Sequence, residues 1–265
     1  MVQLNLTTPT AIIIGIHGCT SSMDYFNKEI YDFVQKYVEQ YLTENEDNKK
    51  VNYVIERMKK QAKLDLESNM KETPQIIVDA NGKYDVTSVI KNLKWNIKIK
   101  EQVHKYHAVF LLCDWIWSWG YQSGMLKSHV FPEVPKCLDH WRMHKFIKLF
   151  TISTAEISGQ KQFLKSTIAG DLCVTFNNYV QFSLVNKRES SFYSILAKLL
   201  RETPSHLLFL TAFVDEAKAA KACGIRSILV VRPGNPTQDT RGFETIEKFT
   251  DIKFEDDPNN PTTCC

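Results

Sequence analysis

Four short apolar runs stand out in the hydrophobic pattern of the chain, at residues 11–16, 146–152, 207–211 and 225–231. Each is nearly continuous rather than alternating and is rich in Ile, Leu, Val or Phe, which is typical of strands buried on both faces of a parallel sheet. A weaker strand pattern occurs around residues 76–78. The pattern therefore predicts a sheet whose strands are spread along the chain.

Apolar positions in the intervening segments recur at helical spacing instead. One such series starts after Asp24 and continues to Tyr41. Further helices are predicted at residues 51–66, 86–97, 103–117, 138–144, 159–165, 190–200 and 216–222. The charged segment 44–50 is poor in apolar residues and is interpreted as a loop between two helices.

Strands that alternate with helices indicate right-handed βαβ crossovers and an α/β fold with a doubly wound parallel sheet. The long helical stretch after the first strand is interpreted as an all-helical cap inserted into that fold. We assign residues 1–21 and 136–254 to the core domain, 22–135 to the cap and 255–265 to a flexible tail. Ligands of such sheets bind beyond the carboxyl ends of the strands, so the loops at those ends form the candidate site.

The chain carries 33 basic and 30 acidic residues, and this net charge of +3 does not favour nucleic acid or a membrane surface as a partner. We recognise no signal peptide and no apolar segment long enough to span a bilayer. The seven cysteines lack metal-ligand spacing and are interpreted as reduced thiols. We expect a cytoplasmic protein, with the nucleus as a further location.

Short motifs occur in a fixed order along the chain. They are WSWGY at residues 117–121, Gly124, Leu126, the pair 129–130, GQK at residues 159–161, LFLT at residues 208–211, the pair 216–217 and VRPGN at residues 231–235. In order and spacing they resemble the enolase-phosphatase (acireductone synthase) family of haloacid-dehalogenase-like hydrolases, which acts in methionine salvage. The resemblance extends from about residue 11 to residue 251 and implies that superfamily's fold.

The resemblance also implies a mechanism. In the family, an aspartate after the first strand attacks phosphorus and binds Mg²⁺, and an acid two residues later transfers protons. A hydroxyl after the second strand and a lysine hold the phosphoryl oxygens, and a further aspartate completes the metal site.

Two of those carboxylates are absent from this chain. The family pattern D-x-E-G-T-T is matched by GIHGCT at residues 15–20, so Gly15 stands at the nucleophile position and His17 at the acid position. The family pattern L-T-D is matched by residues 210–212, so Ala212 stands where the second metal ligand is expected. Glycine and alanine offer no side-chain oxygen, and histidine is a poor ligand for Mg²⁺.

The residues expected to hold phosphate are partly retained. Ser153 and Thr154 match the hydroxyl motif, and Lys187 matches the lysine. Glu216 matches a trailing acid and is a candidate remnant of the metal site. The family continues S-S-G-S at the hydroxyl motif, whereas this chain continues with Ala and Glu. We therefore expect half of a site, able to bind an anion but lacking its metal and nucleophile.

Simpler interpretations of these residues stay open. Lys187 can equally be a solvated surface residue, Ser153 and Thr154 can cap the next helix, and His17 can be hydrogen-bonded to a loop backbone.

Other chemistry is less favoured. Cys19, Thr20 and Ser21 are alternative nucleophiles, but the sequence identifies no partner base for them. The aromatic cluster at residues 115–121 is interpreted as packing the insertion against the core rather than as a surface that stacks on a ligand. The final pair, Cys264 and Cys265, resembles a prenylation signal but lacks the GTPase context, so a plain tail is preferred.

The sequence leaves three functions open. The first is a family member that has lost phosphatase activity, needs no cofactor, and binds phosphate, a phosphorylated small molecule or a protein partner. The second is an active Mg²⁺-dependent enolase-phosphatase acting on a phosphorylated methionine-salvage intermediate. The third is a non-catalytic interaction protein that docks through the helical cap. Because a nucleophile and a metal ligand are both missing, we favour the first.

Overall fold

The computed structural model of the chain describes residues 3–68, 70, 72–80, 82–99, 107–182 and 186–255. The chain divides into two compact units, of which one comprises Met1–Phe26 with Lys127–Cys265 and the other Asn27–Leu126. The proposed tail, with Cys264 and Cys265, lies outside the described residues from residue 256 onward.

Six strands of the described chain form one parallel sheet in the first unit. In spatial order they are β4 (Asn178–Gln181), β3 (Lys148–Ser153), β2 (Ala11–Gly15), β5 (Leu207–Thr211), β6 (Arg226–Val230) and β7 (Glu244–Ile246). The four strands predicted from sequence are the four central ones, and each is almost entirely buried. The predicted doubly wound α/β fold is confirmed.

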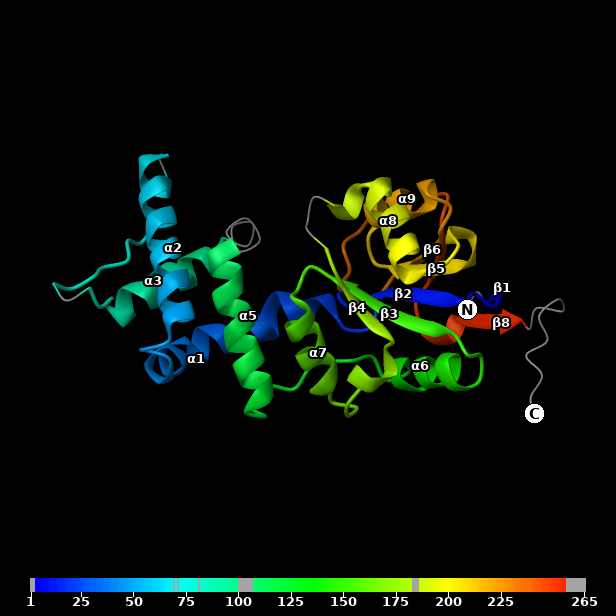
Figure 1. Cartoon of the computed structure of the whole chain (residues 1–265), viewed down its shortest axis with the longest axis horizontal. Helices are drawn as coiled ribbons and strands as arrows, with labels where there is room; N and C mark the ends of the chain where they lie inside the picture. The colour runs from blue at the N-terminus through cyan, green and yellow to red at the C-terminus, as the bar shows by residue number, and fades with distance from the viewer. Residues whose placement is uncertain are drawn as a thin grey trace. The chain divides into compact units, whose positions relative to one another are not determined.

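Helices cover both faces of this sheet (Figure 1). On one face lie α8 (Ser190–Leu200) and α9 (Val214–Ala222), and on the other lie α6 (Val134–Met143) and α7 (Ile157–Lys165). The core under α8 and α9 is built around Ile13, Tyr193 and Phe209, which are fully buried. Burial of such large apolar side chains is the dominant favourable contribution to folding.

The edge strands were not predicted. β4 and β7 expose alternate or consecutive residues and are only four and three residues long. Two more strands, β1 (Leu4–Thr7) and β8 (Ile252–Glu255), pair with each other in parallel outside the main sheet. Short, half-exposed strands carry little hydrophobic signal, because their pairing comes from the neighbouring strand rather than from their own composition.

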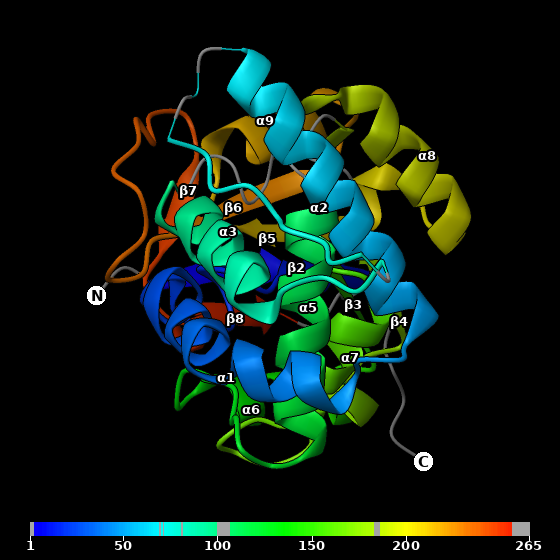
Figure 2. The ribbon, with the colours of Figure 1, turned by 90° about the vertical axis from the view of Figure 1, so that its left-hand side faces the viewer.

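The second unit is helical in its described residues (Figure 2). A π-helical turn, η1 (Tyr25–Glu29), precedes α1 (Ile30–Glu44), and α2 (Lys49–Glu67), α3 (Val86–Lys98) and α5 (His107–Gln122) follow. Trp119 packs against the rings of Phe33, Tyr37 and Tyr41 on α1, so this part of the aromatic cluster is packing within the unit.

Two sequence predictions in this unit were wrong in detail. Residues 76–78 form no strand, because only Val78 makes an isolated antiparallel bridge, to Tyr84. The helix predicted to end at residue 117 continues to Gln122. The start predicted at residue 103 lies outside the described residues.

The division between the units differs from the predicted boundaries at residues 21 and 135. Phe26 stacks on Phe163 of α7 with ring centres 5.1 Å apart, and Tyr25 contacts the same ring. Phe131 lies under the guanidinium of Arg232. These contacts assign residues 22–26 and 127–135 to the unit that contains the sheet.

No described helix combines the length and the apolar character needed to cross a membrane. The cysteines within the described residues, Cys19, Cys113, Cys137, Cys173 and Cys223, are free thiols.

Candidate functional site

The candidate site lies at the carboxyl edge of the parallel sheet. Gly15 ends β2 and pairs with Ile152 of β3, while Ile14 pairs with Leu210 of β5. Strand pairing therefore brings the loops after β2, β3 and β5 to one edge, as the sequence predicted. Of the predicted site residues, Gly15, His17, Ser153, Thr154, Ala212 and Glu216 all belong to these loops or to the first turn after them.

Gly15 and Ala212 lie close together at this edge. A Cβ placed on Gly15 would be 4.0 Å from the Cα of Thr211, the residue before Ala212. Gly18 has a φ of +75°, and a Cβ there would lie 2.7 Å from the Cβ of Ala212. The loop after β2 thus turns against the loop after β5. The side chains present are a hydrogen and a buried methyl group.

Cys19 is not suited to act as a replacement nucleophile. Its side chain is fully buried and its thiol contacts the carbonyl oxygen of Leu210 at 3.6 Å. Burial, and secondarily the charge of Glu216, raises the pKa of this thiol far above its usual range. Because the thiolate is the nucleophile, such a thiol is inert at neutral pH.

The two hydroxyls that follow are buried and engaged. Thr20 Oγ1 donates to the carbonyl oxygen of Ile16 at 3.1 Å. Ser21 Oγ lies 3.4 Å from His129 Nδ1, which also accepts a hydrogen bond from the backbone N–H of Ser22 at 3.1 Å. The sequence alone identified no base beside Ser21, and the structure places His129 there. Ser21 is nevertheless completely buried, so its hydroxyl orders the loop and cannot meet a substrate.

His17 is packed against an aromatic ring. Its imidazole lies on Phe26 with ring centres 3.7 Å apart. The residue is half-buried, and its backbone pairs with that of Ser21 across the turn. The imidazole is thus packed within the loop after β2, and its hydrogen bond to a loop backbone stays a prediction.

Lys187, Glu216 and Thr211 form one connected group. Lys187 Nζ lies 3.2 Å from Glu216 Oε1, and Thr211 Oγ1 donates to Glu216 Oε2 at 2.6 Å. Burial raises the pKa of the Glu216 carboxyl above its usual range, against the opposing effects of Thr211 and Lys187. Lys187 also lies over the ring of Phe213, 4.7 Å from its centre. The positive charge of Lys187 is thus held at this edge, with a buried carboxylate behind it.

Ser153 ends β3, and Thr154 begins a tight local turn. Ser153 Oγ accepts a hydrogen bond from the backbone N–H of Ala155 at 3.2 Å, so its hydroxyl closes its own turn. Gln160, which is almost fully buried, ties this turn down: its Nε2 donates to the carbonyl oxygens of Ala155 and Val180. Gln160 belongs to the GQK motif, which was the only sequence signal for this role.

Arg232 joins the loop after β6 to the loop after β2. Its guanidinium Nη2 lies 2.6 Å from Glu133 Oε1 and donates to the carbonyl oxygen of Cys19 at 3.2 Å. The guanidinium stacks on Phe131, 4.1 Å from the ring centre, and on Phe249. Arg232 is 5% exposed, so this is a structural clamp rather than a ligand-binding group.

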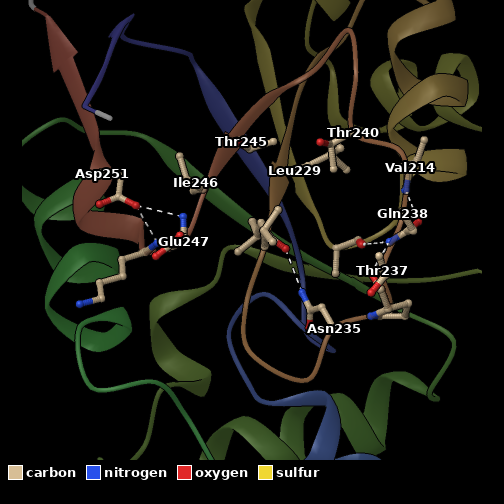
Figure 3. Close-up of a pocket in the computed structure, with 15 residues that line it drawn as sticks. Val214, Leu229, Asn235, Thr237, Gln238, Thr240, Thr245, Ile246, Glu247 and Asp251 are labelled. Carbon is tan, nitrogen blue, oxygen red and sulfur yellow. Dashed lines mark hydrogen bonds between the residues drawn. The ribbon is translucent and has the colours of Figure 1, made fainter. Parts of the chain in front are cut away.

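A cavity of about 590 Å³ adjoins Ala212 (Figure 3). Asn235 Nδ2 donates to the carbonyl oxygens of Gly18 and Val230. These bonds join the rim of the cavity to the loop after β2. Gln238 spans the start of α9: its Nε2 donates to the carbonyl oxygen of Ala212, and its Oε1 accepts from the N–H of Val214, both at 2.9 Å. No sequence pattern pointed to Gln238, because its partners are two backbone groups of a distant loop.

The donor set at this edge does not fit Mg²⁺. This ion requires oxygen ligands in octahedral order, usually including carboxylates. Gly15 and Ala212 supply none, and both oxygens of Glu216 are engaged by Lys187 and Thr211. Within the described part of the chain, no three His, Cys, Asp or Glu side chains are grouped so that they could hold a metal ion.

Comparison with known proteins identifies relatives over nearly the whole chain. Enolase-phosphatase E1 of Anopheles gambiae is 27% identical over 253 residues, which are 94% of this chain and 84% of the mosquito protein. Enolase-phosphatase E1 of Xenopus tropicalis is 29% identical over 92% of this chain and 95% of its own length. A probable bifunctional methylthioribulose-1-phosphate dehydratase/enolase-phosphatase of Vitis vinifera is 30% identical, but this chain spans only 46% of it.

A solved structure with a similar fold is also found. The crystal structure of the UTR4 protein of Saccharomyces cerevisiae superposes with a TM-score of 0.66 at 17% identity, covering 91% of this chain and 98% of the yeast chain. No protein-family model matches the chain.

Proposed function

Because this chain belongs to the enolase-phosphatase family of haloacid-dehalogenase-like proteins, we propose that it is a member without phosphatase activity that retains an anion-binding site. The single observation that carries the proposal is the pair Gly15 and Ala212. They stand at the strand ends where the family mechanism needs a nucleophile and a metal ligand.

The loss affects two kinds of catalysis at once. Without an aspartate at residue 15 there is no group to accept the phosphoryl group covalently. Without carboxylates at residues 15 and 212 there is no charge to hold Mg²⁺ beside the leaving oxygen. Each contribution is typically worth orders of magnitude in rate, and the buried Cys19 thiol does not replace either.

The retained half of the site supports anion binding. The Lys187 side chain is 16% exposed, while its partner Glu216 is only 6% exposed, so the lysine is the member of the pair that an incoming anion can reach. The missing carboxylates would also have repelled an anion in the absence of metal. The ligand chemistry that this arrangement fits is inorganic phosphate or a phosphorylated small molecule, held by Lys187 and the loop at Ser153 and Thr154.

Thermal melting with added ions tests the proposal. A ligand that binds only the folded protein raises the melting temperature, and the rise grows with the logarithm of the ligand concentration once it exceeds the dissociation constant. We expect no stabilisation by Mg²⁺ and a concentration-dependent rise with phosphate. The rise is expected to disappear in Lys187→Ala, and to persist in Lys161→Ala, a matched control on α7 whose ammonium lies over Tyr179.

The alternative function is a retained Mg²⁺-dependent enolase-phosphatase. Stabilisation by Mg²⁺ that depends on the residues around Gly15 would favour that alternative and contradict the proposal. Stabilisation by neither ion would remove the anion-binding half of the proposal.

A further inference from the structure

The helical unit has a groove with a basic rim between α2 and α5. Its volume is about 370 Å³, and its floor is formed by Val54, Ala108, Leu111 and the half-buried Trp115. Lys49, Lys50, Arg57 and His107 line its rim, and all four are exposed. Of the described residues that line the groove, none is acidic.

One face of α2 continues this surface beyond the groove. Lys50, Tyr53, Arg57, Lys60 and Leu64 are spaced by three or four residues, so they lie on one side of the helix. Tyr53 is 63% and Leu64 54% exposed. From Tyr53 to Leu64 the face extends for about 16 Å along the helix axis. An amphipathic helix normally covers such apolar residues, so this face presents a surface for a partner.

Acidic residues near α2 are engaged elsewhere. Glu46 pairs with Lys83, and Glu56 pairs with Lys59 at 3.3 Å. Glu46, Asp47 and Glu56 all line a different cavity, on the side of α2 that faces Lys83. Cations therefore line the groove itself, and the acidic Glu67 lies at the far end of the face, about one turn beyond Leu64.

The start of α2 places like charges together at a cost in helix stability. Lys49 and Lys50 occupy the first turn, which contains no acidic residue. The N-terminus of a helix already carries a partial positive charge, so two lysines there are unfavourable. Local arrangements that oppose stability are expected at sites with a function. Here the helix dipole and the lysines reinforce each other as an attraction for negative charge.

From these observations we infer that the groove binds an acidic amphipathic helix of another protein. Its apolar side chains lie on the floor between Val54, Leu111 and Trp115, as in other helix-in-groove complexes. Its carboxylates meet Lys49, Lys50 and Arg57 on the rim. A flat anionic membrane would leave the concave floor unfilled, and a nucleic acid would set phosphates against Tyr53 and Leu64. The inference does not depend on whether the sheet unit hydrolyses phosphate.

Fluorescence anisotropy with the full chain tests the inference. The probe is a labelled synthetic peptide of Glu, Leu and Ala arranged as an amphipathic helix, compared with a scrambled peptide of the same composition. We expect the ordered peptide to bind more tightly and its binding to weaken as salt increases. Lys50→Glu combined with Arg57→Glu is expected to weaken binding about tenfold or more. Tyr53→Ser combined with Leu64→Ser is expected to weaken it without changing the charge.

Matched controls keep the test specific. Lys91→Glu combined with Lys94→Glu makes the same charge change on exposed positions of α3 and is expected to leave the affinity nearly unchanged. All the substituted residues are exposed, so no variant should melt at a lower temperature, and Lys50→Glu should raise the melting temperature slightly because it places a negative charge at the start of α2. Failure of the ordered peptide to bind, or equal weakening by both double reversals, would overturn the inference. So would preferential binding to phosphatidylserine vesicles or to single-stranded DNA.

Discussion

At the scale of the residue, Gly15 and Gly18 lie three positions apart in one loop but differ in the side chain that their surroundings would accept. A Cβ on Gly15 would lie 3.3 Å from Cys19 Sγ and 3.5 Å from the carbonyl oxygen of Leu210, so a side chain there requires the thiol to shift by a few tenths of an ångström. At Gly18 the left-handed φ and the contacts at 2.7 Å from Ala212 and Asn235 require glycine. The backbone of the loop thus requires glycine at residue 18, whereas at residue 15 only the neighbouring atoms limit the side chain.

Arg232 is the residue whose loss should most disturb this loop. Arg232→Ala removes the partner of Glu133 and of the Cys19 carbonyl. It also removes the guanidinium on which the rings of Phe131 and Phe249 pack. Because breaking a buried ion pair leaves an uncompensated charge, we expect the free energy of unfolding to fall by about 3–5 kcal/mol. Arg232→Lys should recover little of this, since it lacks the planar, forked guanidinium.

Urea unfolding measures the effect. Arg226→Ala is the control, because Arg226 forms an exposed pair with Glu244, and its loss should cost about 1 kcal/mol or less. Equal losses for Arg226→Ala and Arg232→Ala would contradict the role of Arg232 as a buried clamp.

At the scale of the element, Glu202 ties the starts of two central strands together. It follows α8, accepts hydrogen bonds from Lys148 Nζ at 2.8 Å and from Thr10 Oγ1 at 2.6 Å, and its side chain is 8% exposed. Burial alone would raise the pKa of the Glu202 carboxyl, but these bonds outweigh burial and lower it. A carboxyl whose pKa is lowered in the folded state stabilises the fold at higher pH and loses that contribution as it is protonated.

The expected outcome for Glu202→Gln is a pH-dependent loss of stability. Because Lys148 is about half exposed, we expect a loss of about 1 kcal/mol at pH 7. The difference from the unmodified protein should shrink as the pH falls below about 4, the usual range of a glutamate. Chemical unfolding at several pH values measures it, with the exposed Glu244→Gln as control. A difference independent of pH would show that the charge of Glu202 is not involved.

How far the sequence predicts an element depends on how much of it is buried. β2 and β5 carry continuous apolar runs and were predicted almost to the residue, whereas β4 and β7 were missed because their few residues are partly exposed. The same rule holds in the site. Motif order singled out Gly15, Ala212, Lys187 and Glu216 as candidates, but the contacts of Gln238 exist only once distant loops fold together.

At the scale of the whole molecule, the two units carry different features. The sheet unit holds the cation Lys187 at the carboxyl edge of its strands, where Gly15 and Ala212 supply no carboxylate. The helical unit carries a basic groove, whose lining residues are not among those of the candidate site. A protein of this kind is expected to act by binding, with a small anion at one unit and a protein segment at the other.

The most direct test of the central claim is the rate of phosphomonoester hydrolysis with Mg²⁺, measured on para-nitrophenyl phosphate. Three proteins are compared: the unmodified chain, Lys187→Ala, and Gly15→Asp combined with Ala212→Asp. The account predicts that the unmodified chain is no faster than Lys187→Ala and that the restored variant is faster than both, since it regains a nucleophile and a metal ligand. Magnesium-dependent turnover by the unmodified chain that is abolished in Lys187→Ala would contradict the account.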